Sequence, residues 1–463
     1  MLFKYFHVCR FLLIFTGYIG GYSPEELKTD KRETITKAID YELESKEFTS
    51  CSQGGLTGVF SRDRKLNLRK LILLIMSVNS SIQRTLDRFY KTLNKSDYNI
   101  REVTKGAFSQ ARGKLNPESF KRLNKKAVDV FYSINEVNAW FGMRLLAVDG
   151  SRLVLPNHRT VKDEFGVYGL GPNADSERSM ALCSTLYDVL NLLTIDAEIA
   201  PYSCSERELL YKHLDHAKEN DLILMDRGYP GIALFFLMRA KNLHFCARMK
   251  ENWWLEVDKF NKSGEKEAIV AFTLPKKDRK LLKDHPEWIN RTIHCRLVKV
   301  ELPNGESEIL CTSLTDMEEY PHGDFDELYH YRWNQEEGYK LLKCRVEVEE
   351  FSGKTATAVK QDFHAKIFLM TLAAAYSFPI EEKVREEFVA DEQRKHDQKI
   401  NRTNTLSATR DILIGVFVKK EVKQALEAFD RIVYKTREIV RPNRSVKRKP
   451  KPKRQYHMNY KRL

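Results

Sequence analysis

Residues 145–149 read Leu-Leu-Ala-Val-Asp, an apolar run that ends in an acid and is followed by Gly150. A continuous apolar run of this length predicts a buried strand, and the glycine after it predicts a turn. Residues 222–225 form a second such run, Leu-Ile-Leu-Met, which leads into Asp226. Acids at the carboxyl ends of sheet strands lie where the sites of α/β proteins usually form. The two runs therefore predict a sheet with Asp149 and Asp226 at its functional edge.

The segments around these runs predict a mixed sheet flanked by helices. Further strands are predicted at residues 181–187, 190–201 and 243–248. A helix at 205–217 and another after Asp226 alternate with the strands, and strands that precede such an alternation indicate an α/β fold. The core is then expected at residues 140–248 and again at 321–378.

Residues 249–320 interrupt this alternation and predict a small β-rich insertion. Their apolar runs are typical of strands and lie at residues 269–274, 292–302 and 308–313. Pro303-Asn304-Gly305 supplies a hairpin turn between the last two runs.

A helical DNA-binding domain is predicted at residues 61–135, behind a variable leader at 1–60. Apolar spacing and capping residues indicate helices at 66–78, 82–93, 103–115 and from 118 to about 132. Short, basic helices joined by tight turns suit a helix-turn-helix-like domain, although a generic helical bundle gives the same pattern. The exposed candidates for DNA contact on the third helix are Lys105, Ser109, Gln110, Arg112 and Lys114.

The net charge of +14 is concentrated in two parts of the chain. Residues 61–130 carry 17 Lys and Arg against 6 Asp and Glu. Residues 441–463 carry 10 Lys and Arg and no acid, and this tail is expected to be disordered without DNA. The remainder is mildly acidic. Two basic arms on such a body predict a protein that binds nucleic acid and whose core holds cations.

The cysteines and the apolar segments exclude several other classes. The 8 cysteines form no Cys-x-x-Cys pair, which argues against a zinc module or a disulfide framework and fits a reducing cytosol. Residues 1–21 faintly resemble a signal peptide but lack an Ala-x-Ala-like site, so we interpret them as a peripheral segment or an over-extended translation start. No later segment has about 18 uninterrupted apolar residues, so no membrane span is expected. Charged helices are expected at 379–440.

Residues 329–343 (YHYRWNQEEGYKLLK) carry the strongest functional pattern. On a single α-helix, four of their polar side chains share a stripe within about 60° of one another, along about 21 Å. These four are Tyr329, Arg332, Glu336 and Lys343. Arg332 and Glu336 alone would be an ordinary surface pair worth about 0.2–0.5 kcal/mol, but the phenol, the lysine and the two strand-end acids favour an acidic site flanked by cations. Gly338 costs roughly 1 kcal/mol relative to alanine in a helix, so we expect a close approach there.

These residues match a known pattern, because the chain resembles the DDE transposases of bacterial insertion sequences, in the insertion-sequence-four family. The signature of that family is Tyr, two residues, Arg, three residues, Glu, six residues, Lys, and residues 329–343 meet every spacing. Two upstream motifs also match, Val148-Asp149-Gly150-Ser151 and Met225-Asp226-Arg227-Gly228-Tyr229. In motif order the resemblance covers residues 66–418.

The resemblance implies an RNase H-like catalytic core with a β-rich insertion between Asp226 and Glu336. Asp149, Asp226 and Glu336 would hold two Mg²⁺ ions, which Mn²⁺ can replace, since Mg²⁺ prefers hard oxygen ligands. DNA phosphates would be bound by Tyr329, Arg332 and Lys343. Members of the family cut and paste DNA at terminal inverted repeats and work as dimers in the DNA complex. A cytoplasmic, nucleoid-associated bacterial protein is therefore expected.

The expected function is thus a DNA transposase that cleaves inverted repeats and joins them to target DNA. A catalytically silent derivative that acts as an inhibitor or regulator is the alternative from another class. An RNase H-like nuclease without strand transfer is a nearer one. Some members of the family stack a flipped DNA base on a tryptophan of the insertion. For Trp253, Trp254 and Trp288, core packing is the more frequent fate of such a large aromatic side chain.

Overall fold

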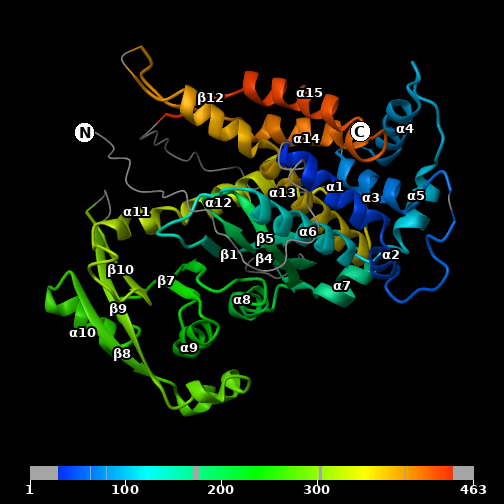
Figure 1. Cartoon of the computed structure of the whole chain (residues 1–463). Coiled ribbons are helices and arrows are strands. Elements are labelled where there is room, and N and C mark those ends of the chain that lie inside the picture. The colour runs from blue at the N-terminus through cyan, green and yellow to red at the C-terminus, as the bar shows by residue number, and fades with distance from the viewer. Residues whose placement is uncertain are drawn as a thin grey trace.

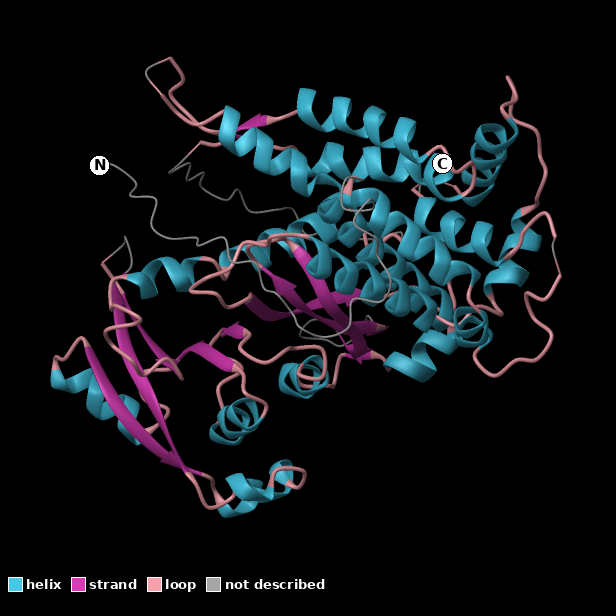
Figure 2. Cartoon of the chain, in the orientation of Figure 1, coloured by secondary structure: helices cyan, strands magenta, loops and turns pink. Residues whose placement is uncertain are grey.

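The computed structural model describes residues 30–441, apart from 63, 80, 170–176, 302–304 and 392. One large sheet lies at the centre, with helices on both faces (Figures 1 and 2). Helices α8 (Glu206–His213) and α9 (Ile232–Ala240) lie on one face, whereas the N-terminal and C-terminal helices gather on the other. The α/β fold class is confirmed. The interpretations of residues 1–21 and of the tail beyond Arg441 fall outside the described residues.

The central sheet has 8 strands in the order β5-β4-β1-β6-β7-β10-β9-β8. Its strands are β1 (Leu145–Val154), β4 (Met180–Asp188), β5 (Leu193–Pro201), β6 (Leu222–Met225), β7 (His244–Arg248), β8 (Glu267–Thr273), β9 (Thr292–Glu301) and β10 (Ser307–Thr312). The pairs β1–β4 and β4–β5 are antiparallel, whereas β1–β6 and β6–β7 are parallel. These five strands form the mixed sheet of the RNase H-like core that the resemblance implies.

Strand β1 is longer than the sequence indicated. The turn expected after Asp149 does not form, because β1 keeps pairing with β4 as far as Val154, opposite Met180. Its other neighbour, β6, ends at Met225, opposite Val148. Asp149 is therefore the first residue of β1 beyond its parallel pairing with β6. It lies at the end of that pairing, where the sequence predicted a functional site.

The β-rich insertion continues the central sheet. Strand β10 pairs antiparallel with β7, from Thr312 opposite Cys246 to Leu310 opposite Arg248. Strands β9 and β8 follow by antiparallel pairing, and α10 (Leu255–Ser263) lies beside them (Figure 1). Pro303 and Asn304 of the expected hairpin turn fall outside the described residues. The insertion thus covers the open edge of β7, which would otherwise expose unpaired backbone groups.

Helices begin well before residue 61. The N-terminal helices are α1 (Lys31–Glu44), α2 (Lys46–Gln53), α3 (Leu68–Ser77), α4 (Ile82–Asn94), α5 (Lys105–Arg112) and α6 (Glu118–Ile134). Ile35, Ile39 and Phe48 of the first two helices are buried in the main core. The sequence did not reveal them because a helix that buries one narrow stripe needs few apolar residues. Residues 31–53 are therefore part of the fold, and not a variable leader.

The later helices complete the face of the sheet that α6 covers. They are α11 (Asp324–His330), α12 (Trp333–Lys340), α13 (Ala356–Glu387), α14 (Arg402–Phe417) and α15 (Val422–Lys435); the short α7 (Arg159–Phe165) lies between β1 and β4 in sequence. Helix α13 continues through Pro379, where a break was expected. Its burial on most sides outweighs the roughly 3 kcal/mol that an internal proline costs. In the described part of the chain, α13 is the one helix long and apolar enough to span a membrane, and 89% of its apolar window is buried as in a core helix.

Arg112 joins the N-terminal helices to α13 through a buried ion pair. Its Nη2 lies 2.9 Å from Asp362 Oδ1, and its Nε donates to Gln361 Oε1 at 2.9 Å. Arg112 is 4% exposed and Asp362 is 3% exposed. Burial alone would raise the pKa of Asp362, but Arg112 and Lys366 hold it below its usual value. The prediction that Arg112 is an exposed DNA contact is wrong, because its side chain points from α5 into the core.

We expect Arg112→Ala to lower the free energy of unfolding by about 3–5 kcal/mol, because it leaves Asp362 buried without its partner. Lys114→Ala, on the exposed side of the same segment, should change stability by less than about 0.5 kcal/mol. Urea unfolding followed by circular dichroism measures both. Equal effects of the two substitutions would contradict the structural role assigned to Arg112.

Candidate active site

Two predicted acids lie side by side at the end of the parallel ladder between β1 and β6. Val148 pairs with Met225, so Asp149 and Asp226 are the next residues of their strands. The backbone N–H of Gly150 donates to Asp149 Oδ1 at 2.8 Å. Burial, with smaller contributions from neighbouring acids, raises the pKa of Asp149 to about 6. The edge of the sheet therefore holds neighbouring carboxylates, of which that of Asp149 is poorly hydrated.

Helix α12 carries Glu336 and docks on the sheet through buried polar contacts on either side of it. Gln335 Nε2 donates to Thr185 Oγ1 at 2.6 Å and to the Thr185 carbonyl at 3.1 Å. The Tyr339 hydroxyl donates to the carbonyl of Asp149 at 2.7 Å. These two anchors hold the turn of α12 that carries Glu336 against β1 and β4.

Arg332 lies among all three acids. Its Nη2 is 3.3 Å from Glu336 Oε1, and its side chain is largely buried. Burial alone would lower the pKa of Arg332, but Tyr329 and the charges of the three acids raise it above its usual value. These acids are Asp226, Asp149 and Glu336. The structure thus brings together three of the predicted acids and one predicted cation, from β1, β6 and α11–α12.

The segment of the signature is not one continuous helix. Helix α11 ends at His330, a turn separates it from α12, and Leu341–Arg345 forms a π-helical turn. The single stripe expected for the four signature residues therefore does not form. Turns and π-helical geometry change the angular spacing of side chains, which the spacing on an ideal α-helix does not contain.

Two signature residues make different contacts from those expected. Tyr329 is 5% exposed, and its hydroxyl donates to the carbonyl of Met225 at 3.4 Å. Lys343 lies along β1, where its Nζ donates to the carbonyl of Arg152 at 2.7 Å. Tyr329 therefore supports the loop of Asp226 from inside the protein. Its buried hydroxyl is not placed for the DNA phosphate contact expected of it.

The acids have the donor chemistry that a divalent cation requires. In the part of the chain that the structure describes, no three His, Cys, Asp or Glu side chains form a ready-made metal centre. Asp226 Oδ1 is nonetheless buried without a hydrogen-bond partner. A buried carboxylate oxygen without a partner is costly unless it binds a cation. Three carboxylates with such an oxygen among them fit Mg²⁺, which prefers hard oxygen ligands.

Strand β7 adds a cationic residue that the sequence analysis missed. Ala247 pairs with Met225, so Arg248, the last residue of β7, is the first residue beyond the parallel ladder with β6. Arg248 Nη1 lies 4.0 Å from Asp226 Oδ1, and its Nη2 lies 2.8 Å from Glu308 Oε1. Arg248 ends the strand predicted at residues 243–248, but it was missed because only acids were sought at the ends of strands.

The insertion places an exposed aromatic ring next to this edge. Trp253 is 42% exposed and lines a cavity of about 420 Å³ with Arg227, Arg248 and Lys250. Trp254 and Trp288 are instead partly buried against the core. Core packing is therefore confirmed for Trp254 and Trp288 and is wrong for Trp253.

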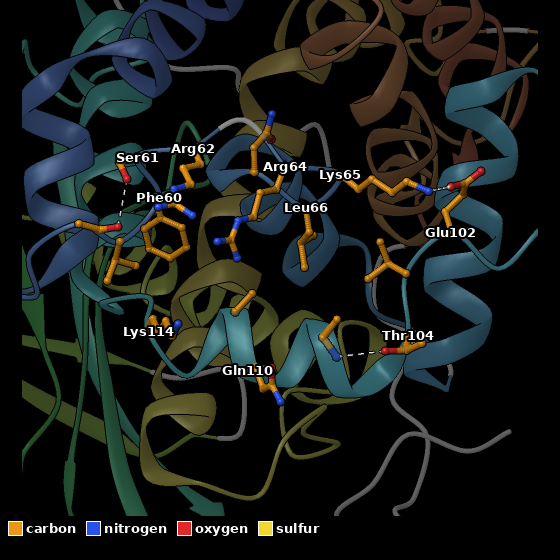
Figure 3. Close-up of a pocket in the computed structure, with 16 residues that line it drawn as sticks. Phe60, Ser61, Arg62, Arg64, Lys65, Leu66, Glu102, Thr104, Gln110 and Lys114 are labelled. Carbon is orange, nitrogen blue, oxygen red and sulfur yellow. Dashed lines mark hydrogen bonds and ion pairs between the residues drawn. The ribbon is translucent and has the colours of Figure 1, made fainter.

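A second cationic region lies on the N-terminal helices (Figure 3). Gln110 of α5 and Lys114, which follows α5, line a cavity of about 800 Å³ together with Arg62 and Arg64. Lys65 also lines it and pairs with Glu102 at 2.7 Å. Lys105 and Ser109 are exposed on the same helix but do not line the cavity. The arginines were missed because they precede the first helix that the sequence indicated.

Comparison with known families identifies the class of protein. The family described as "Transposase DDE domain" matches residues 140–372, just over half of the chain, and the match includes both aspartates and Glu336. The chain therefore belongs to the DDE transposase family, and its function as a DNA transposase is confirmed.

Individual transposases are also similar to this chain. It is 26% identical over 326 residues to "Transposase InsG for insertion sequence element IS4" of Escherichia coli (strain K12), which covers 67% of this chain and 69% of that protein. The resemblance to the insertion-sequence-four family is thereby confirmed. A piggyBac transposase synaptic complex with hairpin DNA aligns over 88% of this chain and 84% of its own, with 14% identity and a TM-score of 0.43.

Gly338 packs against the ring of Tyr187, where an added Cβ would lie 3.5 Å from Tyr187 Cζ. That is ordinary contact, so we expect Gly338→Ala to raise the free energy of unfolding by up to about 1 kcal/mol through helix propensity. In Gly353→Ala the new Cβ would lie 2.6 Å from Ala358 Cβ, and this variant should be destabilised. Denaturant unfolding compares the two. A destabilised Gly338→Ala would show that the close approach itself requires glycine.

Proposed function

We propose that this transposase binds terminal inverted repeats and moves DNA by a cut-and-paste reaction that uses two divalent cations. The observation that carries the proposal is the convergence of Asp149, Asp226 and Glu336 around one guanidinium, that of Arg332. Such a site suits phosphodiester chemistry, because a negatively charged phosphate must be held close to negatively charged carboxylates. Water would attack at the transposon end, and the freed 3′-hydroxyl would then attack target DNA.

Asp149, Asp226 and Glu336 would hold the two cations, with Asp149 shared between them. Bound Mg²⁺, or Mn²⁺ in its place, activates the attacking oxygen and stabilises the leaving oxygen. The unpartnered Oδ1 of Asp226 and the high pKa of Asp149 support this assignment. Gln335 and Tyr339 keep the third carboxylate in position.

Cations around the acids would position the DNA backbone. Arg332, whose Nη2 contacts Glu336, would hold a phosphate beside the acids. Lys343 and Arg248 lie on two sides of the acids, near β1 and β7. Phosphate contacts of this kind fix the register of DNA without reading its sequence. Tyr329 would act indirectly, through the backbone of the Asp226 loop.

The N-terminal helices would recognise the inverted repeat. Lys105, Ser109 and Gln110 are exposed on α5, and Lys114 is exposed in the turn after it. The cavity beside them adds Arg62 and Arg64. A dimer would hold the two ends of the element in one complex, in the bacterial cytoplasm where the nucleoid is accessible.

Alanine at Asp149, Asp226 or Glu336 should abolish cleavage and leave repeat binding largely intact, because each change removes a cation ligand but no repeat contact. The assay uses a labelled duplex that carries the terminal repeat, with Mg²⁺ or with EDTA. Glu337→Ala is the matched control, since Glu337 is exposed and pairs only with Lys340. A fully active Asp226→Ala protein would contradict the assignment of these acids as cation ligands.

The same assay separates the alternatives. Repeat binding without cleavage under any metal would indicate a regulator. Cleavage without joining of the freed 3′-hydroxyl to target DNA would indicate a nuclease.

Removal of residues 441–463 should weaken DNA affinity and flatten its dependence on salt. The tail carries 10 Lys and Arg, and each phosphate that a cation neutralises adds about 0.9 to the slope of log K against log salt. Fluorescence anisotropy between about 50 and 200 mM salt measures the slope. A full-length variant with glutamine in place of the 10 Lys and Arg of the tail controls for chain length. An unchanged slope would refute the role of the tail.

A further inference from the structure

A fourth carboxylate reaches the active site from the opposite face of the sheet. Glu206 is the first residue of α8, and its side chain lies against Gly150 and Gly228, which follow the two catalytic aspartates closely in sequence. A Cβ at residue 150 would lie 2.4 Å from Glu206 Oε1, and a Cβ at residue 228 would lie 3.4 Å from Oε2. The glycines of both aspartate motifs thus leave the space that this carboxylate fills.

Glu206 has no hydrogen-bond or ion-pair partner among the residues that the structure describes. The neighbouring cation, Arg152, lies over the ring of Tyr202, with Cζ 4.9 Å from the ring centroid. Burial and the charge of Asp226 raise the pKa of Glu206 despite Arg152. Glu206 is thus held close to Asp226 without an ion-pair partner among the described residues, and Arg152 offsets its charge only in part.

The Tyr229 hydroxyl lies near the carboxylates of Glu206, Asp149 and Asp226. Tyr229 is 1% exposed, and its hydroxyl has no hydrogen-bond partner within the described ranges. Burial, followed by the charges of Glu206, Asp149 and Asp226, raises its pKa well above the usual value. The nearby Ser184 hydroxyl donates to the carbonyl of Asp149. The Tyr229 hydroxyl therefore lies among these carboxylates, where it can donate to one of them and orient it.

We propose that Glu206 is a fourth carboxylate of the cation site, and that it supplies an oxygen donor beside Asp149 and Asp226 while Tyr229 orients it. The inference rests on the proposed function of these aspartates. Glu206 contributes to the raised pKa of Asp149, and Asp226 contributes to that of Glu206, so these acids lie within electrostatic reach of one another. With a cation, the same four groups satisfy its demand for hard oxygen ligands.

Binding of Mn²⁺ to the full-length protein without DNA tests the proposal, measured by electron paramagnetic resonance of the free ion. We expect Glu206→Gln to weaken Mn²⁺ affinity at least about tenfold. Glu208→Gln is the matched control on the same helix, because glutamine keeps the capping box that Glu208 forms with Ser205. Equal affinities of the two variants would overturn the proposal.

Gly150→Ala tests the role of Glu206 independently. The new methyl group would displace the flexible end of Glu206 without altering its charge. It should therefore weaken Mn²⁺ binding as Glu206→Gln does, and the two effects should not add in the double variant. Additive effects would overturn the proposal. Thermal unfolding without metal identifies any variant that loses affinity merely because it is unfolded.

Asp226→Ala separates failure of this inference from failure of the proposed function. If Asp226→Ala binds Mn²⁺ as tightly as the native protein, the cation site itself is wrong. If Asp226→Ala loses binding and Glu206→Gln keeps it, the three-acid site stands and Glu206 is not part of it.

Discussion

The active site depends on the parallel pairing of β1 with β6. This ladder ends where Val148 faces Met225, so the chain places one carboxylate after each strand at the same edge. Neither aspartate needs a loop to carry it to the other. A shift of one residue in this register would turn Asp149 or Asp226 to the opposite face of the sheet, because side chains alternate along a strand. The chemistry therefore rests on backbone hydrogen bonds in the most buried part of the fold.

The elements around that edge offset the unfavourable free energy of placing several acids close together. Burial raises the pKa of Asp149 to about 6, and a buried charge without compensation is strongly unfavourable. Arg332 and Arg248 approach from two different elements, α11–α12 and β7. The aspartates still retain an unsatisfied oxygen. The fold thus tolerates a site whose charge a bound cation would balance, as the proposed function requires.

Much of this architecture could be predicted from local patterns, and the failures have a common cause. Continuous apolar runs identified the central strands, and the spacing of the signature identified Glu336. The sequence could not show that Arg112 turns inward, because its partner Asp362 is remote in the chain and only tertiary packing brings the two together. Tyr329 was misjudged for a related reason. The segment assumed to be one α-helix is divided into α11, a turn, α12 and a π-helical turn.

The insertion shows how far the central sheet determines the surroundings of the site. An independent β domain could take any position relative to the acids. Here β10 adds directly to β7, opposite Ala247 and Arg248, so the same hydrogen-bonded sheet that positions Asp226 also positions the insertion. Trp253 and Lys250 follow β7 closely and are therefore held beside the acids. An aromatic ring and several cations at the edge of the cleavage site are thus a consequence of strand order, and no flexible linker has to bring them there.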